Sequence, residues 1–311
     1  FVSNIASTDG TNEFLNDESQ KRNNLIIYNQ PQDQTIKSNK YYLNRIISDN
    51  VDWVWFMGDD DKLSTRDSIQ KVYECLKNNY SSNLEFLHVC ESNRSNNTLK
   101  IFKDDVFKLC NKFGYHEMLG WISSIILKKD TFKKVFEDFT KLNNFHYKDS
   151  SDSIVSAYPH SASILKFTHD KLGIFMDHGL VEPQNKVQTQ ETIHRWSDEN
   201  MLWRYFHVID DIENLINEKI LSENSLNLSF FRYHTFYLWD HLIYLTFKRL
   251  PSAIKSSNSL EKINTQIHLL STNLNRLLKA QNFLKDTKDK KNLILILSMC
   301  INYLKIYVSN N

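Results

Sequence analysis

The chain has 311 residues, of which 41% are hydrophobic and 13% aromatic, enough apolar material for one large domain or two ordinary ones. Its formal net charge is +1, so it lacks the excess of basic residues that non-specific nucleic-acid binding requires, and we expect no nucleic acid among its partners. The four cysteines are widely spaced and form no C-x-x-C pair, which predicts free thiols in a reducing compartment.

The first half of the chain alternates short apolar runs with helical patterns. Strands are expected at residues 25–28, 52–57, 84–89, 121–129 and 171–176, and helices at 40–50 and directly after residue 64. The second of these helices should turn one apolar face to the core, made of Ile69, Val72, Tyr73 and Leu76. Such alternation is typical of an α/β fold in which helices cover a sheet.

The second half is helical almost throughout from about residue 197. We place a boundary near residues 185 to 200, which divides the chain into an α/β domain at 1–190 and a helical domain at 191–311. A heptad-like apolar stripe spans residues 260–277 and favours a core position, with an oligomer seam through the helical domain as the alternative.

Neither a leader peptide nor a transmembrane run is visible. The chain opens without Met, so we expect that residue 1 is not the natural start. The longest apolar run, residues 293–308, is interrupted by polar residues and favours a buried last helix. A membrane-surface helix is the alternative, because Lys288, Lys290 and Lys291 lie just upstream.

Three consecutive aspartates, Asp59, Asp60 and Asp61, follow the apolar run at residues 51–57. Carboxylates this close repel one another unless a cation neutralises them. Ligands of open α/β sheets bind beyond the carboxyl ends of the strands, and Mg²⁺ or Mn²⁺ there takes one or two carboxylates together with substrate phosphates. A site for a divalent metal and a phosphorylated ligand is therefore predicted; the alternative is a solvated turn in which one aspartate caps the next helix.

A second motif, VSNIASTDGT at residues 2–11, predicts a strand that ends in a turn. Together with FMGDDDKL at residues 56–63, and with the strand and helix expected between them, it resembles the family 2 glycosyltransferases of GT-A fold, in the branch of bacterial O-antigen and capsule (abequosyltransferase-like) transferases. The resemblance covers roughly residues 1–185. It implies a Rossmann-like mixed sheet flanked by helices, followed here by an all-helical domain, and it implies that the family's first strand is missing from this chain.

The resemblance also assigns roles to the aspartates. Asp60 would bind the metal with Asp61 in support, and Asp59 would contact the ribose or sugar of a nucleotide-sugar donor.

In the same comparison, the family's base-contacting aspartate falls at Asn4, which can still hydrogen-bond a base edge but carries no charge. Ser3 and Asp9 belong to the same nucleotide-binding motif, and Asn44 matches an asparagine on the helix before the aspartate strand.

An inverting transferase needs a general base that takes the proton from the acceptor hydroxyl. The resemblance places it in the region of residues 146–163, where Asp152 is the first candidate, His160 the second and Asp149 the third; each can instead be a capping or solvated residue. Pro159 and His160 are expected to begin a helix.

Two further segments have expected roles. Arg195 would bind the diphosphate and His194 the metal, unless the pair belongs to a hinge. Thr192 replaces the glutamine of processive relatives, which favours addition of a single sugar. Gly120 and Trp121 would shape an acceptor pocket, with a core tryptophan as the alternative.

The sequence thus predicts a metal-dependent inverting glycosyltransferase with Mn²⁺ or Mg²⁺ as cofactor. It would move one sugar to a glycan or undecaprenyl-linked acceptor in surface-polysaccharide synthesis, in the cytoplasm or at the inner face of the cell membrane. A nucleotidyltransferase of similar fold and an inactive glycan-binding or scaffold subunit are the alternatives.

Overall fold

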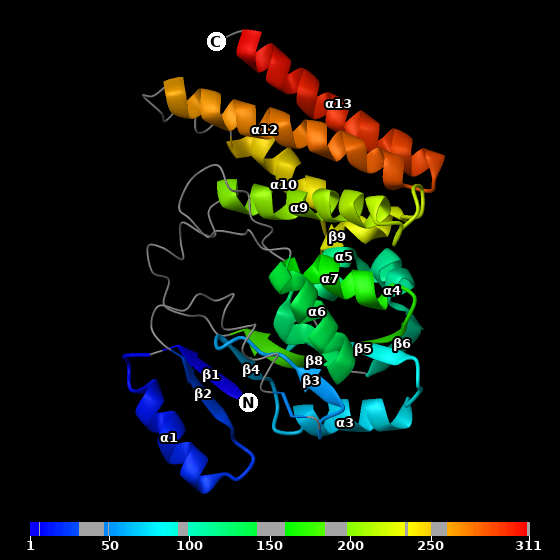
Figure 1. Cartoon of the computed structure of the whole chain (residues 1–311). Helices are drawn as coiled ribbons and strands as arrows, with labels where there is room; N and C mark the ends of the chain where they lie inside the picture. Colours follow the sequence, from blue (N-terminus) through cyan, green and yellow to red (C-terminus); the bar gives the residue numbers. More distant parts are fainter. Residues whose placement is uncertain are drawn as a thin grey trace.

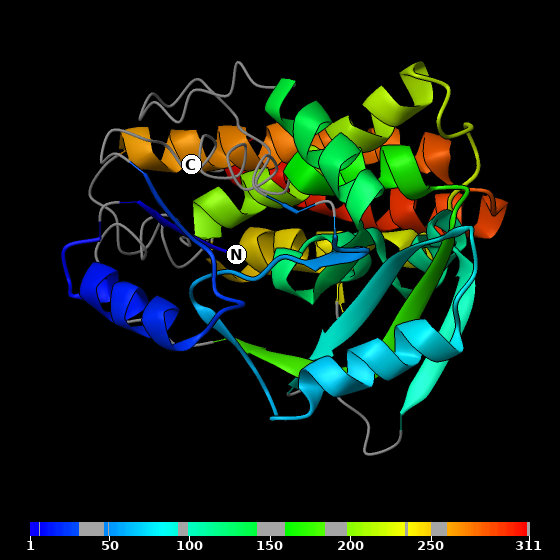
Figure 2. The same ribbon diagram turned by 60° about the horizontal axis from the view of Figure 1, so that its bottom comes forward.

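The computed structural model describes residues 1–5, 7–30, 47–48, 50–92, 99–141, 159–183, 198–233, 236–249 and 260–309. It contains a six-stranded mixed sheet with one helix on one face and several on the other, and a layer of C-terminal helices beyond the latter (Figures 1 and 2). The expected fold class, a mixed α/β sheet flanked by helices and followed by a helical region, is confirmed.

The sheet has the strand order β3-β7-β5-β8-β4, with β6 paired to β8 as well. β5 and β8 are parallel, whereas β7 is antiparallel to both β3 and β5, and β4 and β6 are antiparallel to β8. The strands are β1 (Val2–Ile5), β2 (Ile27–Gln30), β3 (Trp53–Trp55), β4 (Asp61–Leu63), β5 (Leu84–Glu91), β6 (Lys100–Asp105), β7 (Ile125–Lys128), β8 (Leu172–Pro183), β9 (Arg232–Tyr233) and β10 (Phe236–Tyr237).

Helices account for most of the remaining described residues. In the first half they are α1 (Thr11–Lys21), α3 (Ser68–Asn78), α4 (Val106–Phe113), α5 (Tyr115–Leu119), the 3₁₀ turn η2 (Ile122–Ser124), α6 (Lys129–Lys141) and α7 (Pro159–Thr168). In the second half they are α9 (Asp198–Asn217), η3 (Leu228–Phe231), α10 (Leu238–Tyr244), the π-helical η4 (Leu245–Arg249), α12 (Leu260–Ala280), η5 (Gln281–Phe283) and α13 (Thr287–Ser309).

The central strand β5 contributes side chains to two hydrophobic cores, one on each face of the sheet. Alternate side chains of a strand point to opposite faces. Phe86 and Cys90 therefore join the large core formed with α4 to α7, whereas Leu87 and Val89 join a smaller one with Val72 of α3. The larger core continues into the C-terminal helices, so apolar packing runs across the expected domain boundary.

Several element predictions need correction. A short strand, β4, begins at the last of the three aspartates and was not predicted, and the helix expected directly after residue 64 begins at Ser68. β8 continues to Pro183, far beyond the expected end at residue 176, because its later residues pair with β4. The strand expected at 121–129 begins instead with η2, and β6 was not predicted.

The expected core face of α3 is only partly right. Val72 is buried, but Ile69 is 61% and Tyr73 56% exposed, and the small residues Ser68 and Cys75 are buried in their place. The buried face of the helix therefore combines Val72 with the small side chains of Ser68 and Cys75. Most of the helix expected at 40–50 lies outside the described residues.

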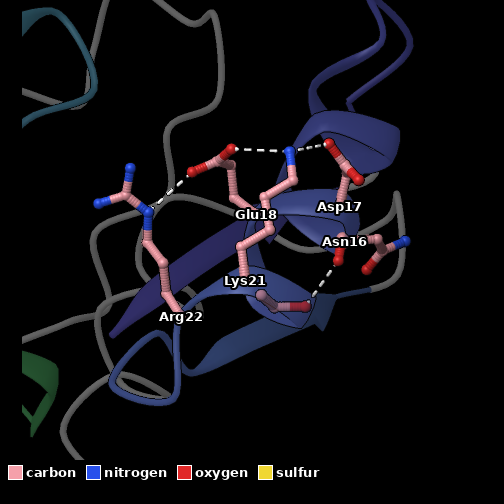
Figure 3. A network of polar contacts seen from close by, with 6 residues as sticks. Asn16, Asp17, Glu18, Lys21 and Arg22 are labelled. Atoms are coloured by element: carbon pink, nitrogen blue, oxygen red, sulfur yellow. Dashed lines mark hydrogen bonds and ion pairs between the residues drawn. The ribbon is translucent and has the colours of Figure 1, made fainter.

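Helix α1 links β1 and β2, which pair in parallel with each other. It buries none of its residues, and ion pairs line its exposed surface: Lys21 lies 2.5 Å from Asp17 and 3.3 Å from Glu18, and Arg22 lies 2.8 Å from Glu18 (Figure 3). Exposed pairs at this spacing contribute little to the stability of a helix, because water and salt screen them. The sequence analysis did not predict this helix.

In the helical region, Leu270, Leu274 and Leu277 of α12 are buried, which confirms the core interpretation of the heptad-like stripe for these residues. α13 packs on α12 as the outermost helix (Figure 1). Only part of its apolar surface is buried, so the expected buried last helix is half right. No helix among the described residues combines the length and the apolarity needed to cross a membrane.

Candidate functional site

The three aspartates lie where β3 gives way to β4, in a segment we call the acidic turn (residues 58–61). The Asp61 amide donates to the Gly58 carbonyl at 3.3 Å, and Asp61 pairs with Pro183 of β8. A Cβ on Gly58 would lie 2.7 Å from Asp60 Oδ1 and 3.1 Å from Asp61 Oδ2. Two carboxylates therefore fold back over Gly58, and the glycine is needed for space rather than for an unusual backbone angle.

Asp61 is held by two donors from the segment before β7. Ser123 Oγ donates to Asp61 Oδ2 at 2.5 Å, and Trp121 Nε1 donates to the same oxygen at 3.2 Å. Ser123 Oγ also accepts the Gly58 amide at 2.8 Å, so one hydroxyl joins both ends of the acidic turn.

The electrostatics of the acidic turn favour a cation. Burial raises the pKa of Asp61 above its ordinary value, and the charges of Asp60 and Asp59 raise it further, while the bonds from Ser123 and Trp121 oppose the rise. A raised pKa means that the protein disfavours the charged carboxylate. A bound divalent ion would reverse this penalty.

The segment that holds Asp61, residues 119–124, is itself anchored from several sides. Trp55 of β3 donates from Nε1 to the Ser123 carbonyl at 2.8 Å. Ser124 Oγ donates to the Trp121 carbonyl at 2.6 Å and lies 3.2 Å from His88 Nδ1, which in turn lies 3.1 Å from the Met118 carbonyl. His88 is buried on β5, so the segment is fixed to the centre of the sheet.

Helix α7 begins at Pro159, as predicted. Ser161 Oγ donates to the carbonyl of Leu119 at 2.7 Å, two residues before Trp121, and His160 is 5% exposed. The start of α7, which ends the stretch expected to supply the base, is thus tied to the segment that holds Asp61. Asp149 and Asp152 lie outside the described residues.

The N-terminal motif forms a separate, local network. Asn4 is 5% exposed; its Nδ2 donates to Asn29 Oδ1 at 3.1 Å, and its Oδ1 accepts Ser7 Oγ at 2.6 Å. Ser3 Oγ accepts Gln30 Nε2 at 2.5 Å. The polar atoms expected at a nucleotide base therefore already have partners within the protein.

Asp9 lies just before α1 and is exposed. Its Oδ1 accepts the Thr11 hydroxyl at 2.6 Å and the Thr11 amide at 3.2 Å, and these bonds lower the pKa of Asp9. Gly10 adopts φ +86°, a left-handed angle that glycine tolerates best. The expected turn at residues 9–11 is confirmed; Gly10 is the N-cap of α1, and Asp9 accepts the amide of the first helical residue, Thr11.

The two halves of the expected nucleotide-sugar site lie in different sheets. In the described part of the chain β1 and β2 pair only with each other, and the acidic turn belongs to the six-stranded sheet. The hydrogen bonds of Asn4, Ser3 and Asp9 described above run to neighbours in this small sheet and at the start of α1. Asn44, His194 and Arg195 lie outside the described residues.

The donor set of the acidic turn suits a hard divalent ion. Within the described ranges no group of three His, Cys, Asp or Glu side chains is gathered as a metal site. Mg²⁺ and Mn²⁺, however, typically take only one or two carboxylates and complete their shell with water and phosphate oxygens. Asp60 and Asp61, whose oxygens converge beside Gly58, meet that requirement.

Ser123 is the site residue that the sequence analysis missed. It is fully buried next to Ser124 inside an otherwise apolar run. Buried hydroxyls need hydrogen-bond partners, so two serines before a core strand were a usable signal. Trp121, expected to shape an acceptor pocket, is partly buried and donates to Asp61.

Neither a family model nor a curated protein matches the chain. Among solved structures, it is similar to the mannosyltransferase PcManGT from Pyrobaculum calidifontis in complex with GDP-Man and Mn²⁺, with 13% sequence identity and a TM-score of 0.41, over 98% of this chain and 76% of that one. A likeness of this degree does not define an activity, so function has to be argued from the residues of the chain itself.

Proposed function

We propose that the chain is a metal-dependent glycosyltransferase of the GT-A type, which moves one sugar from a nucleotide-sugar donor to a hydroxyl of a glycan or lipid-linked acceptor. The observation that carries the proposal is the acidic turn. It holds Asp60 and Asp61 together beyond the carboxyl end of β3, where burial and the neighbouring carboxylates raise the pKa of Asp61. A capping turn needs one aspartate, not two that converge.

In this proposal Asp60 is the metal ligand, Asp61 supports it, and Asp59 contacts the ribose or sugar. Mn²⁺ or Mg²⁺ would supply positive charge to offset the charge on the departing nucleoside diphosphate. Arg195 and His194 would add a phosphate and a metal contact from the segment after β8, and Asn4, Ser3, Asp9 and Asn44 would serve the nucleotide.

The general base is proposed from the stretch that ends at His160, with Asp152 first, His160 second and Asp149 third. Support comes from the bond between Ser161 and Leu119, which fixes the end of that stretch beside the segment carrying Trp121. A base there would remove the acceptor proton as the sugar transfers with inversion. Trp121 and Gly120 would border the acceptor.

The biological setting is proposed from the resemblance of the two motifs alone. It is the synthesis of a bacterial surface polysaccharide, O-antigen or capsule, in the cytoplasm. We place the enzyme at the inner face of the membrane, because Leu295, Met299 and Ile306 of α13 are 59–62% exposed and basic residues lie near its N-terminal end.

The test is transfer or hydrolysis of nucleotide sugars by the full chain, with Mn²⁺ and with a chelator. Wild-type protein should release the nucleoside diphosphate only with metal, and Asp60→Ala should lower that rate at least about a hundredfold, since the group that holds the metal is gone.

Asp170→Ala, which removes an exposed carboxylate on the loop before β8, is the control and should keep full activity. Full activity of Asp60→Ala would contradict the metal role. Formation of a nucleotide sugar from a nucleoside triphosphate and a sugar phosphate, with release of pyrophosphate, would instead favour a nucleotidyltransferase. Failure to bind any nucleotide sugar would favour a scaffold subunit.

A further inference from the structure

Two adjacent serines, both fully buried, face different partners. Ser123 Oγ binds the acidic turn at two points, Gly58 N at 2.8 Å and Asp61 Oδ2 at 2.5 Å. Ser124 Oγ binds the Trp121 carbonyl and contacts His88, and touches none of the aspartates in the described structure. The Ser123 hydroxyl can therefore influence the shape of the acidic turn, whereas the Ser124 hydroxyl only anchors residues 119–124.

A serine hydroxyl suits this position because it has one proton to donate and lone pairs that accept. At Ser123 it accepts the Gly58 amide and donates to Asp61 at the same time, which closes a ring from the start of the acidic turn to its end. Trp121 Nε1 adds a second donor on the same carboxylate oxygen, 3.2 Å away. The carboxyl of Asp61 is thus oriented by the protein before any ligand arrives.

The Asp60 carboxylate lies close to the same ring. Asp60 Oδ1 and Asp61 Oδ2 lie 2.7 and 3.1 Å from the position that a Gly58 Cβ would take, so the two carboxylates share one small space. Their mutual repulsion would otherwise drive them apart, and burial of Asp61 adds to that penalty. A donor fixed at Ser123 offsets part of this repulsion.

From this geometry we infer that Ser123 is a positioning residue for the metal: it clamps the acidic turn so that Asp60 and Asp61 converge before a divalent ion binds. The inference rests on the proposed function. It adds that the segment around Trp121, residues 119–124, would contact the acceptor and also orient the metal-binding carboxylates. A change at the acceptor side would therefore alter the metal side of the site. Pre-organised ligands bind more tightly because less order is lost on binding.

The experiment titrates Mn²⁺ into the full-length protein and follows the paramagnetic resonance signal of the free ion, so the readout is binding and not activity. Ser123→Ala should weaken Mn²⁺ binding roughly tenfold, the loss expected when a hydrogen bond to a charged group is removed. Trp121→Phe, which keeps the ring but removes the donor, should weaken it less. Ser124→Ala, equally buried and one residue away, should stay within about twofold of wild type.

A second readout needs no metal. Amide hydrogen exchange in residues 58–61 should speed up in Ser123→Ala and not in Ser124→Ala, because only Ser123 accepts the Gly58 amide. Equal exchange in the two variants would overturn the clamp.

The outcomes also separate this inference from the proposed function. Wild-type binding of Mn²⁺ with no loss in Ser123→Ala, or with an equal loss in Ser124→Ala, would overturn the inference alone. Absence of Mn²⁺ binding by the wild type, with nucleoside diphosphates present, would contradict the proposed function and this inference together.

Discussion

Two partly buried carboxyls, those of Asp61 and Asp211, show how burial changes the pKa of single residues of this chain. Asp61 is stabilised by donors from Ser123 and Trp121, and its pKa is still raised. Asp211 of α9 accepts the Tyr115 hydroxyl at 3.2 Å, and burial raises the pKa of Asp211 to about 7, with the charge of Asp210 adding and the Tyr115 bond opposing. The first lies beside other carboxylates, whereas the second joins α9 to α5.

Asp211 predicts a pH dependence of folding. The unfolded carboxyl ionises near the ordinary value of 3.8, whereas the folded one keeps its proton up to about pH 7. Between these values the unfolded state has lost a proton that the folded state retains, so the free energy of unfolding should fall as pH rises through this window. Because the residue keeps some solvent contact, we expect a loss of roughly 1–3 kcal/mol.

Asp211→Asn removes the proton equilibrium and should flatten this part of the profile. Urea denaturation at about pH 4 and about pH 8 measures it, with the exposed Asp170→Asn as control. An Asp211→Asn profile with the same slope as wild type would show that the folded carboxyl titrates normally.

Helices and strands were predicted correctly where the local hydropathy pattern agrees with the burial of the element in the fold. β5 was predicted because most of its residues are apolar and both of its faces are buried, and α7 because Pro159 marks its start. The prediction for α3 was partly wrong because hydropathy favours Ile69 and Tyr73, whereas the buried face contains Val72 and the small residues Ser68 and Cys75. β4 and the end of β8 depend on pairing with each other, which no local pattern encodes.

The same limit applies to the candidate site. The acidic turn was visible because three consecutive aspartates are conspicuous in any sequence. The serines before β7 were a usable signal for a buried hydrogen bond, but the partners of Ser123 could not be predicted, because Gly58 and Asp61 are more than sixty residues away along the chain. The sequence also could not indicate that the Asn4 side chain would form hydrogen bonds with Asn29 and Ser7.

The outer face of α13 predicts that this helix binds a membrane surface. Leu295, Met299 and Ile306 lie on one face at helical spacing and are 62%, 59% and 62% exposed. Beyond Asp289 the chain has no further acidic residue, so basic side chains dominate the charge of this helix. An apolar face with basic residues suits the surface of an anionic membrane.

Flotation with vesicles of phosphatidylglycerol and phosphatidylcholine tests this surface, with pure phosphatidylcholine as reference. Wild-type protein should float with the anionic vesicles, and the double variant Leu295→Glu/Met299→Glu should not. Ile69→Glu, on α3 and 61% exposed, is the matched control and should float as wild type does. Flotation of the double variant at the wild-type level would exclude this face.

For the whole molecule, one core runs from the six-stranded sheet through α4 to α7 into α9, α12 and α13 (Figure 1). Packing alone therefore does not mark the predicted boundary between residues 190 and 191, which stays a prediction. The small sheet of β1 and β2 has its own local network. The nucleotide half of the proposed site depends on this small sheet, and the metal half on the acidic turn.

The central claim is that the acidic turn binds a nucleotide sugar through a divalent ion. Thermal unfolding of the full chain with UDP, GDP, CDP and dTDP, each with Mn²⁺ and with a chelator, tests it most directly. We predict that one of these nucleotides raises the unfolding temperature only when Mn²⁺ is present, and that Asp60→Ala abolishes the rise, since ligands stabilise the state that binds them. No rise with any nucleotide, or the same rise in Asp60→Ala, would contradict the account.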